Sequence, residues 1–206
     1  MLPDLTVPSS LAVLLADFRP CFTAPTFQVF RALVCGMLSV TGRRTVCGML
    51  VGAGLSRIWP HDRAHRFFAA AVWSVDEVGV VLARLVVRLL VPAGAPVTVA
   101  VDDTLFHRRG KKVWAAGWFH DSSALDARQV GYGNNWVIVG IVVALPMLDR
   151  PVCLPVQARL VCKDTTSASR LWLAARAVEK LAAAMPGRRL HAVAYAGDEL
   201  RTLGVR

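Results

Sequence analysis

The sequence predicts an α+β fold, in which a helical N-terminal domain is followed by an α/β domain. In the first 91 residues, apolar side chains recur at helical spacing between breaks that contain Gly or Pro. Residues 97–206 instead contain alternating and β-branched runs that are typical of strands. The segment PAGAP at 92–96 is the best candidate for the boundary. We therefore predict a helical region over residues 1–91 and a second domain over residues 97–206.

Charge and cysteine content limit the partners and the compartment. The chain has 206 residues, which is enough to bury a substantial core. Its net charge of +10 is shared between residues 1–96 (+4) and residues 97–206 (+6), so both parts are candidates for contact with nucleic acid. None of the five cysteines forms a C-x-x-C pair, which favours buried thiols in a cytosolic protein over disulfides or a zinc site.

A mean hydropathy of +0.47 raises the alternative of a membrane-associated or structural helical protein. The longest apolar runs argue against it, because charges or a proline interrupt each one before the roughly 20 residues that a spanning helix requires. The start of the chain, MLPDLTVPSS, lacks the basic segment and apolar core of a secretory signal. We therefore expect no membrane partner and a cytoplasmic location.

Helical spacing accounts for the N-terminal region. A first helix begins after Pro8 and ends at Pro20, and a short helix over 46–51 follows a polar turn at 41–45 that contains Arg43 and Arg44. Between them, a second helix begins near Thr26 and places a set of apolar side chains on one face: Phe27, Phe30, Leu33, Val34, Met37 and Leu38. Helix, turn and short helix is the order of a helix-turn-helix DNA-binding motif, although any small helical bundle gives the same pattern.

Two histidines stand out in the next segment. His61 and His65 are four residues apart and could share a helix face as metal ligands. Without a third ligand, we interpret them as surface residues. Residues 74–77 then favour the start of another helix, which continues to Pro92.

The run VTVAV at 97–101 predicts a strand that leads directly into two carboxylates, Asp102 and Asp103. Four basic residues follow closely: Arg108, Arg109, Lys111 and Lys112. Carboxylates bind hard divalent cations and basic side chains bind phosphates, so this layout suits a cation site beside a polyanion. The alternative is a strand followed by a solvated turn.

Further strands are expected after this one. Residues 113–120 can form a second strand, and residues 121–135 are polar and contain glycine. The β-branched run at 136–145 is suited to a buried central strand. Residues 151–161 can form an extended segment, which its two prolines would place at a sheet edge.

A helix and a last strand complete the pattern. Residues 163–167 can cap a helix that carries an apolar stripe of Leu171, Trp172, Ala175, Val178, Leu181 and Ala182. Residues 190–195 then predict a strand. The predicted order is three strands, a possible edge segment, a helix and a strand, and the acidic pair lies on the first strand. This order and this placement are compatible with the ribonuclease H-like plan.

Several stretches together resemble the IS701-type insertion-sequence transposases of the DDE superfamily: FRALVCGMLSVTGRRTVCGML, HDRAHRFFAAAVWS, VDDTLFHRRGKKVWAAGWFHD, GYGNNWVIVGIVV, RPVCLPV and KDTTSASRLWLAARAVEKLAAAMPGRRLH. The resemblance covers nearly the whole chain. It implies a helical region that helps to bind transposon ends and a ribonuclease H-like catalytic domain. There, three carboxylates hold two Mg²⁺ or Mn²⁺ ions about 4 Å apart. It also implies DNA as the partner and the nucleoid of the bacterial cytoplasm as the location.

The resemblance assigns the first acid to the pair Asp102 and Asp103. The form D-x-T favours Asp102, but neighbours in a strand point to opposite faces, so Asp103 stays an alternative. The nearby basic residues then become candidates for phosphate contact, and Arg43 and Arg44 for contact with transposon ends.

The second and third acids are where this chain departs from the family. Its relatives resemble HVVADAAYAG, whereas this chain has HAVAYAG at 191–197, which is three residues shorter and lacks the Asp. Asp198 is the candidate substitute, and the third acid, a Glu, would lie beyond Arg206. We therefore expect a transposase truncated at its C-terminus and unable to catalyse transposition alone.

Two consequences follow from this expectation. The incomplete sheet would leave an edge and an apolar face uncovered, which favours instability or association into a homo-oligomer. The alternative function is a DNA-binding module that recognises transposon ends without catalysis.

Overall fold

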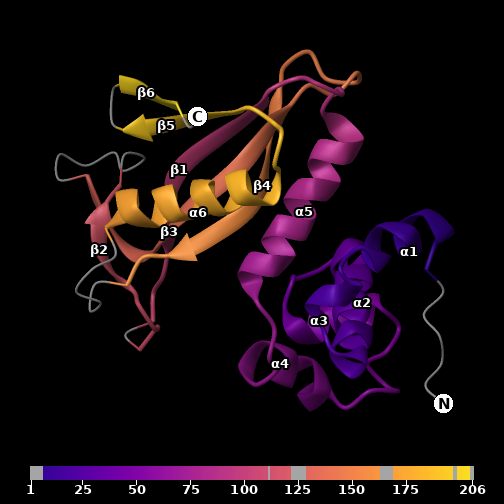
Figure 1. Cartoon of the computed structure of the whole chain (residues 1–206). Helices are drawn as coiled ribbons and strands as arrows, with labels where there is room; N and C mark the ends of the chain where they lie inside the picture. Colours follow the sequence, from indigo (N-terminus) through magenta and orange to yellow (C-terminus); the bar gives the residue numbers. More distant parts are fainter. Residues whose placement is uncertain (1–6, 111, 122–128, 163–168, 197–198, 205–206) are drawn as a thin grey trace. The chain divides into compact units, whose positions relative to one another are not determined.

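The computed structural model describes residues 7–110, 112–121, 129–162, 169–196 and 199–204 (Figure 1). Helices and a mixed sheet are both present, which confirms the α+β class. The chain divides into two compact units, Met1–Val81 and Leu82–Arg206. This division falls inside α5 (Val75–Leu90), ahead of the PAGAP segment, because the C-terminal part of α5 contributes Ala83 and Val86 to the core of the second unit.

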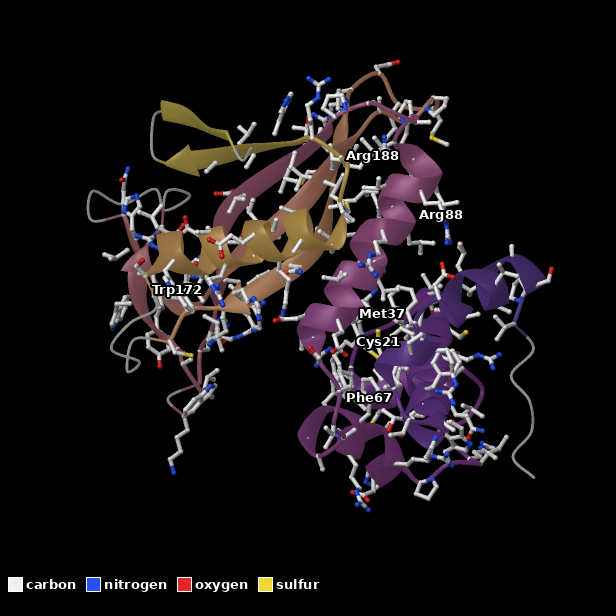
Figure 2. The ribbon with its side chains drawn as sticks, in the orientation of Figure 1. Cys21, Met37, Phe67, Arg88, Trp172 and Arg188 are labelled. Carbon is white, nitrogen blue, oxygen red and sulfur yellow. The ribbon has the colours of Figure 1, made fainter. Side chains whose placement is uncertain are left out.

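The first unit is helical. Its elements are α1 (Ser9–Ala16), the 3-10 turn η1 (Arg19–Cys21), α2 (Ala24–Ser39), α3 (Val46–Gly52), α4 (His61–Ala69) and the beginning of α5. Aromatic rings form its centre: the ring of Phe22 lies 4.7 Å from that of Phe30 and 6.0 Å from that of Phe67, which is labelled in Figure 2. Such ring pairs each add about 0.5–1.5 kcal/mol beyond the area they bury.

Helices α2 and α3 pack backbone against backbone. A Cβ atom on Gly36 would lie 1.8 Å from the carbonyl oxygen of Met49, so only glycine permits this approach. The contact turns the side of α2 that carries Val29, Ala32 and Leu33 inward. Two residues of the predicted apolar face are consequently exposed: Met37 (48%, labelled in Figure 2) and Leu38 (67%).

The second unit is built on a six-stranded sheet. Its strands are β1 (Val97–His107), β2 (Gly117–His120), β3 (Val130–Val143), β4 (Val152–Leu160), β5 (Leu190–Ala196) and β6 (Glu199–Gly204). The order is β2-β3-β1-β5-β6, and β4 also pairs with β3. Strand β1 runs antiparallel to β3 and parallel to β5, which follows α6 (Arg170–Ala184). This succession agrees with the predicted ribonuclease H-like plan.

One face of the sheet forms the core of this unit. Val97, Val99 and Val101 of β1 are buried there, whereas the alternate residues Thr98 and Ala100 are only partly buried. Helix α6 and the C-terminal part of α5 both supply apolar side chains to this same cluster. The alternation along β1 therefore defines a core face and an opposite face.

Three strand boundaries differ from the prediction. The first strand, predicted over 97–101, continues through the acidic pair to His107 because its second half still pairs with β3. The second strand is limited to β2, because residues 113–116 form a turn in which Ala115 has a φ of 54° and the N–H of Ala116 donates to the carbonyl oxygen of Val113. Strand β3 begins at Val130, well inside the segment predicted to be polar and irregular. That segment enters the sheet because its polar side chains find partners there.

Strand β4 pairs only with β3 among the described strands, so it lies at an edge as its prolines predicted. Pro155 lies next to a shift in the register between β3 and β4. The last described strand, β6, pairs antiparallel with β5 and was not predicted. None of the described helices is both long enough and apolar enough to cross a membrane.

Helix α6 begins at Arg170, where the hydroxyl of Ser169 accepts a hydrogen bond from the N–H of Trp172. The cap predicted over 163–167 lies outside the described residues. Leu171 and Trp172 (labelled in Figure 2) are exposed, in contrast to the predicted stripe. Both precede the part of α6 that packs on the sheet through Ala177, Val178 and Leu181.

Candidate active site

The acidic pair lies within β1, with one carboxylate on each face of the sheet. Asp103 follows the alternation of the buried valines and so lies on the core face. Asp102 lies on the opposite face, the face to which the strand pairing assigns Cys153 of β4. The two adjacent acids therefore meet different groups, although their backbones touch.

Asp103 accepts two hydrogen bonds on the same oxygen. The Nδ2 of Asn135 lies 3.0 Å from Oδ2 of Asp103, and a guanidinium nitrogen of Arg170 lies 2.6 Å from the same atom. Asn135 comes from β3 and Arg170 from the first turn of α6. The carboxylate is thus held between a neutral amide donor and a cation.

Burial by itself raises the pKa of Asp103. The hydrogen bonds from Asn135 and Arg170, together with the positive charge of Arg170, outweigh that effect and hold the pKa below its usual value. Asp103 is consequently ionised at neutral pH, and its charge is neutralised by Arg170. Asn135 is completely buried, and its Oδ1 has no hydrogen-bond partner within the described residues.

Asp102 has a simpler environment. Its Oδ1 accepts a hydrogen bond from the backbone N–H of Asp103 at 2.8 Å, and the residue is exposed. The part of the chain that the structure describes gives it no ion pair with a Lys, Arg or His. Its negative charge acts on Cys153, since burial and, secondly, the charge of Asp102 raise the pKa of that thiol.

The structure gives a side-chain hydrogen bond to one described residue of the basic segment after β1, Arg108. Arg108 donates from Nε to Oδ1 of Asn134 at 2.9 Å, and Nδ2 of Asn134 donates to the carbonyl oxygen of Trp114 at 2.8 Å. Arg109 and Lys112 are exposed, and Lys111 lies outside the described residues. Asn134 and Asn135 are neighbours in β3 and point to opposite faces of the sheet. Asn134 therefore binds Arg108 of the basic segment, whereas Asn135 binds Asp103.

The other predicted contacts are dispersed or fall outside the description. Arg43 and Arg44 are exposed in the turn between α2 and α3 of the helical unit. Asp198, the candidate substitute for the second acid, lies outside the described residues. His61 and His65 share α4 with their ring centroids 6.0 Å apart, and His65 also approaches the sulfur of Cys47 at 3.7 Å.

A histidine and aspartate pair lies further along the core face. Nε2 of His107 is 2.9 Å from Oδ2 of Asp121, whose side chain is only 7% exposed. A Cβ atom on Gly131 would lie 2.8 Å from both of these side chains, so the glycine makes room for the pair. Glycines inside a strand pattern often mark such a close approach, and this signal could have pointed to the pair.

Sequence reasoning also missed Asn135 and Arg170. They are separated from Asp103 by 32 and 67 residues, and no local pattern connects them.

Two divalent ions require several ligands that converge on them. Among the described residues, no three His, Cys, Asp or Glu side chains are arranged to hold a metal ion. Asp102 and Asp103 cannot converge on one ion from opposite faces of the sheet. The described part of the chain by itself therefore does not fit a two-ion centre.

The fold and the acid-bearing central strand define a ribonuclease H-like protein. The family model described as DDE superfamily endonuclease matches residues 17–202, and the chain belongs to this family. The family implies a DNA substrate and a nuclease or transposase activity that generally uses divalent metal ions. No curated protein and no solved structure matches the chain significantly.

Proposed function

We propose that this chain is an IS701-type transposase whose described residues bind DNA at transposon ends and do not cut or join DNA by themselves. Its place would be the nucleoid of the bacterial cytoplasm, and Mg²⁺ or Mn²⁺ would be the ion that its relatives use. The observation that carries the proposal is the separation of the acidic pair. One carboxylate is neutralised by Arg170 on the core face, and the other, on the opposite face, has no ion pair among the described residues.

Of the two acids, we assign Asp102 as the remnant of the first catalytic position. A metal ligand needs an oxygen that is not already occupied by a cation, and the carboxylate of Asp102 meets this condition. The bound oxygen of Asp103 does not, because a metal ion would have to displace Arg170 and Asn135. Asp103 then acts as a structural link between β1, β3 and α6.

The proposal of inactivity is tested with supercoiled plasmid DNA and the full chain in Mg²⁺ or Mn²⁺. We expect no nicking above that of a control without protein. Nicking that disappears in the double variant Asp102→Ala plus Asp103→Ala would overturn the proposal.

A second candidate function is recognition of transposon ends without any link to catalysis. The close packing of α2 on α3 favours it, because the turn that joins these two packed helices carries the exposed Arg43 and Arg44 side by side in sequence. The test compares binding to end sequences with binding to random DNA at the same salt concentration. Equal affinities would contradict specific recognition, and unchanged affinity in Arg43→Gln plus Arg44→Gln would remove this turn from the interface.

A further inference from the structure

A groove of about 280 Å³ opens in the helical unit between the beginning of α2 and one side of α4. Its apolar lining includes the buried side chains of Val29 and Phe67, and Ala70 lies on its wall. Its charged lining residues are Arg63 and Arg66, and none of the described residues that line it is a carboxylate. The groove therefore combines an apolar floor with positive charge alone.

The two arginines are differently held. The guanidinium of Arg63 lies over the ring of Trp59, 4.2 Å from its centroid, which fixes its position at the groove. Arg66 lies three residues further along α4, on the same side of the helix, and has no ion pair within the described residues. One cation is thus oriented in advance, and the other is free to take an anion.

The beginning of α2 adds to this positive field. The hydroxyl of Thr23 is 2.9 Å from that of Thr26, and Thr23 gives the helix no side-chain cap. Pro25 has no N–H, so Ala24 and Thr26 carry the N–H groups of the first turn; no side-chain cap satisfies them, and Thr26 lines the groove. An anion at this point would meet two guanidinium groups and a helix N-terminus.

We propose that the groove binds a single unpaired nucleotide of DNA, with its base against the apolar floor and its phosphate at Arg63 and Arg66. This inference rests on the proposed function, which brings DNA to the chain. Duplex DNA exposes phosphates and sugars but keeps its base faces stacked inside, so it cannot cover the floor beside Phe67. An unpaired nucleotide offers both an anion and an aromatic face. The volume is at the lower end for ligand pockets and suits one nucleotide.

The test measures the affinity of the full chain for a fluorescent single-stranded oligonucleotide and for a duplex of the same length, at one salt concentration. Arg66→Gln removes this cation and, because Arg66 is exposed and has no ion pair among the described residues, should leave stability unchanged. We expect roughly tenfold weaker binding of the single strand. The matched control is Arg57→Gln, which removes an equal charge from an exposed site of the same unit that does not line the groove. Equal losses in the two variants would overturn the proposal.

A second variant tests the apolar floor without a change of charge. Ala70→Trp fills the groove from an exposed position at its wall. We expect it to weaken single-strand binding while duplex binding stays within twofold of the wild-type value. If Ala70→Trp bound the single strand as tightly as the wild type does, the groove proposal would be wrong. The proposed function would still hold, provided that the chain binds duplex DNA. A wild-type chain that binds neither form of DNA would overturn both.

Discussion

Asp102 and Asp103 are neighbours in one strand, yet the two faces of the sheet give them opposite surroundings. On the core face, Asp103 is held by a buried amide and by a guanidinium from α6. On the opposite face, Asp102 is exposed, and its charge helps to raise the pKa of the Cys153 thiol. The comparison teaches that the carboxylate with the stronger partners is the one less available to a metal ion, because those partners already occupy its oxygen.

Truncating a buried apolar side chain on the core face should have the largest effect on stability. Ile141 is completely buried on the core face, whereas its neighbour Val142 is only partly buried on the opposite face. We expect Ile141→Ala to lower the free energy of unfolding by about 3–4 kcal/mol, and Val142→Ala by about 1 kcal/mol. Urea unfolding of the full chain, followed by circular dichroism, measures both. Equal losses would mean that both faces are equally packed.

Removing the buried amide should have the next largest effect. Asn135→Ala deletes a hydrogen bond to a charged group at a fully buried position, so we expect a loss of about 2–3 kcal/mol in stability. The pKa of Asp103 should rise, because a donor that favours its ionised form is lost. Titration of the Asp103 carboxyl carbon by NMR measures this shift. The control is Asn134→Ala, which releases Arg108 and should leave that pKa in place.

The ion pair on the core face should contribute less, because Arg170 and Asp103 are both partly exposed. We expect Arg170→Gln to cost about 1 kcal/mol or less at neutral pH. Arg176→Gln, which breaks an exposed pair with Glu179 on the same helix, is the matched control and should cost less.

The effect of Arg170→Gln should also depend on pH. Because the folded-state pKa of Asp103 lies below its usual value, the pair stabilises the fold above that usual value. Its contribution is lost as the pH falls through the folded-state pKa. The difference between wild type and Arg170→Gln should therefore shrink in acid, and a difference that grows in acid would contradict the assigned ion pair.

The smallest effect is expected at Cys153. Since the charge of Asp102 helps to raise the pKa of this thiol, Asp102→Asn should lower that pKa and speed alkylation of Cys153 by roughly twofold at fixed pH. Mass spectrometry of the peptide that contains Cys153 separates it from the other cysteines. Asp103→Asn acts on the other face and should leave the rate unchanged. If both variants gave the same acceleration, the assignment of faces would be wrong.

Local patterns predicted much of this fold. The helical first part, the strand that leads into the acidic pair, the proline-containing edge strand and the late helix and strand all agree with the structure. The errors have a common cause. Met37 and Trp172 fit an apolar stripe by spacing, but which side of a helix is buried depends on its neighbours, and here Gly36 sets the packing of α2.

The candidate site was less predictable than the fold. The position of Asp102 and Asp103 came from local sequence, and so did the basic run after them. Asn135 and Arg170 reach Asp103 only because the pairing of β3 with β1 and the docking of α6 bring them there. The pair of His107 and Asp121 depends in the same way on Gly131 in a neighbouring strand.

By itself, the sequence determined that a β-branched run leads into two acids and that positive charge follows them, because alternation and charge are properties of consecutive residues. Only the tertiary structure decided that Arg170 neutralises the charge of Asp103 and that Asp102 is exposed on the opposite face. The physical reason is that a side chain's partners are set by strand register and helix docking, which join residues that are far apart in the chain.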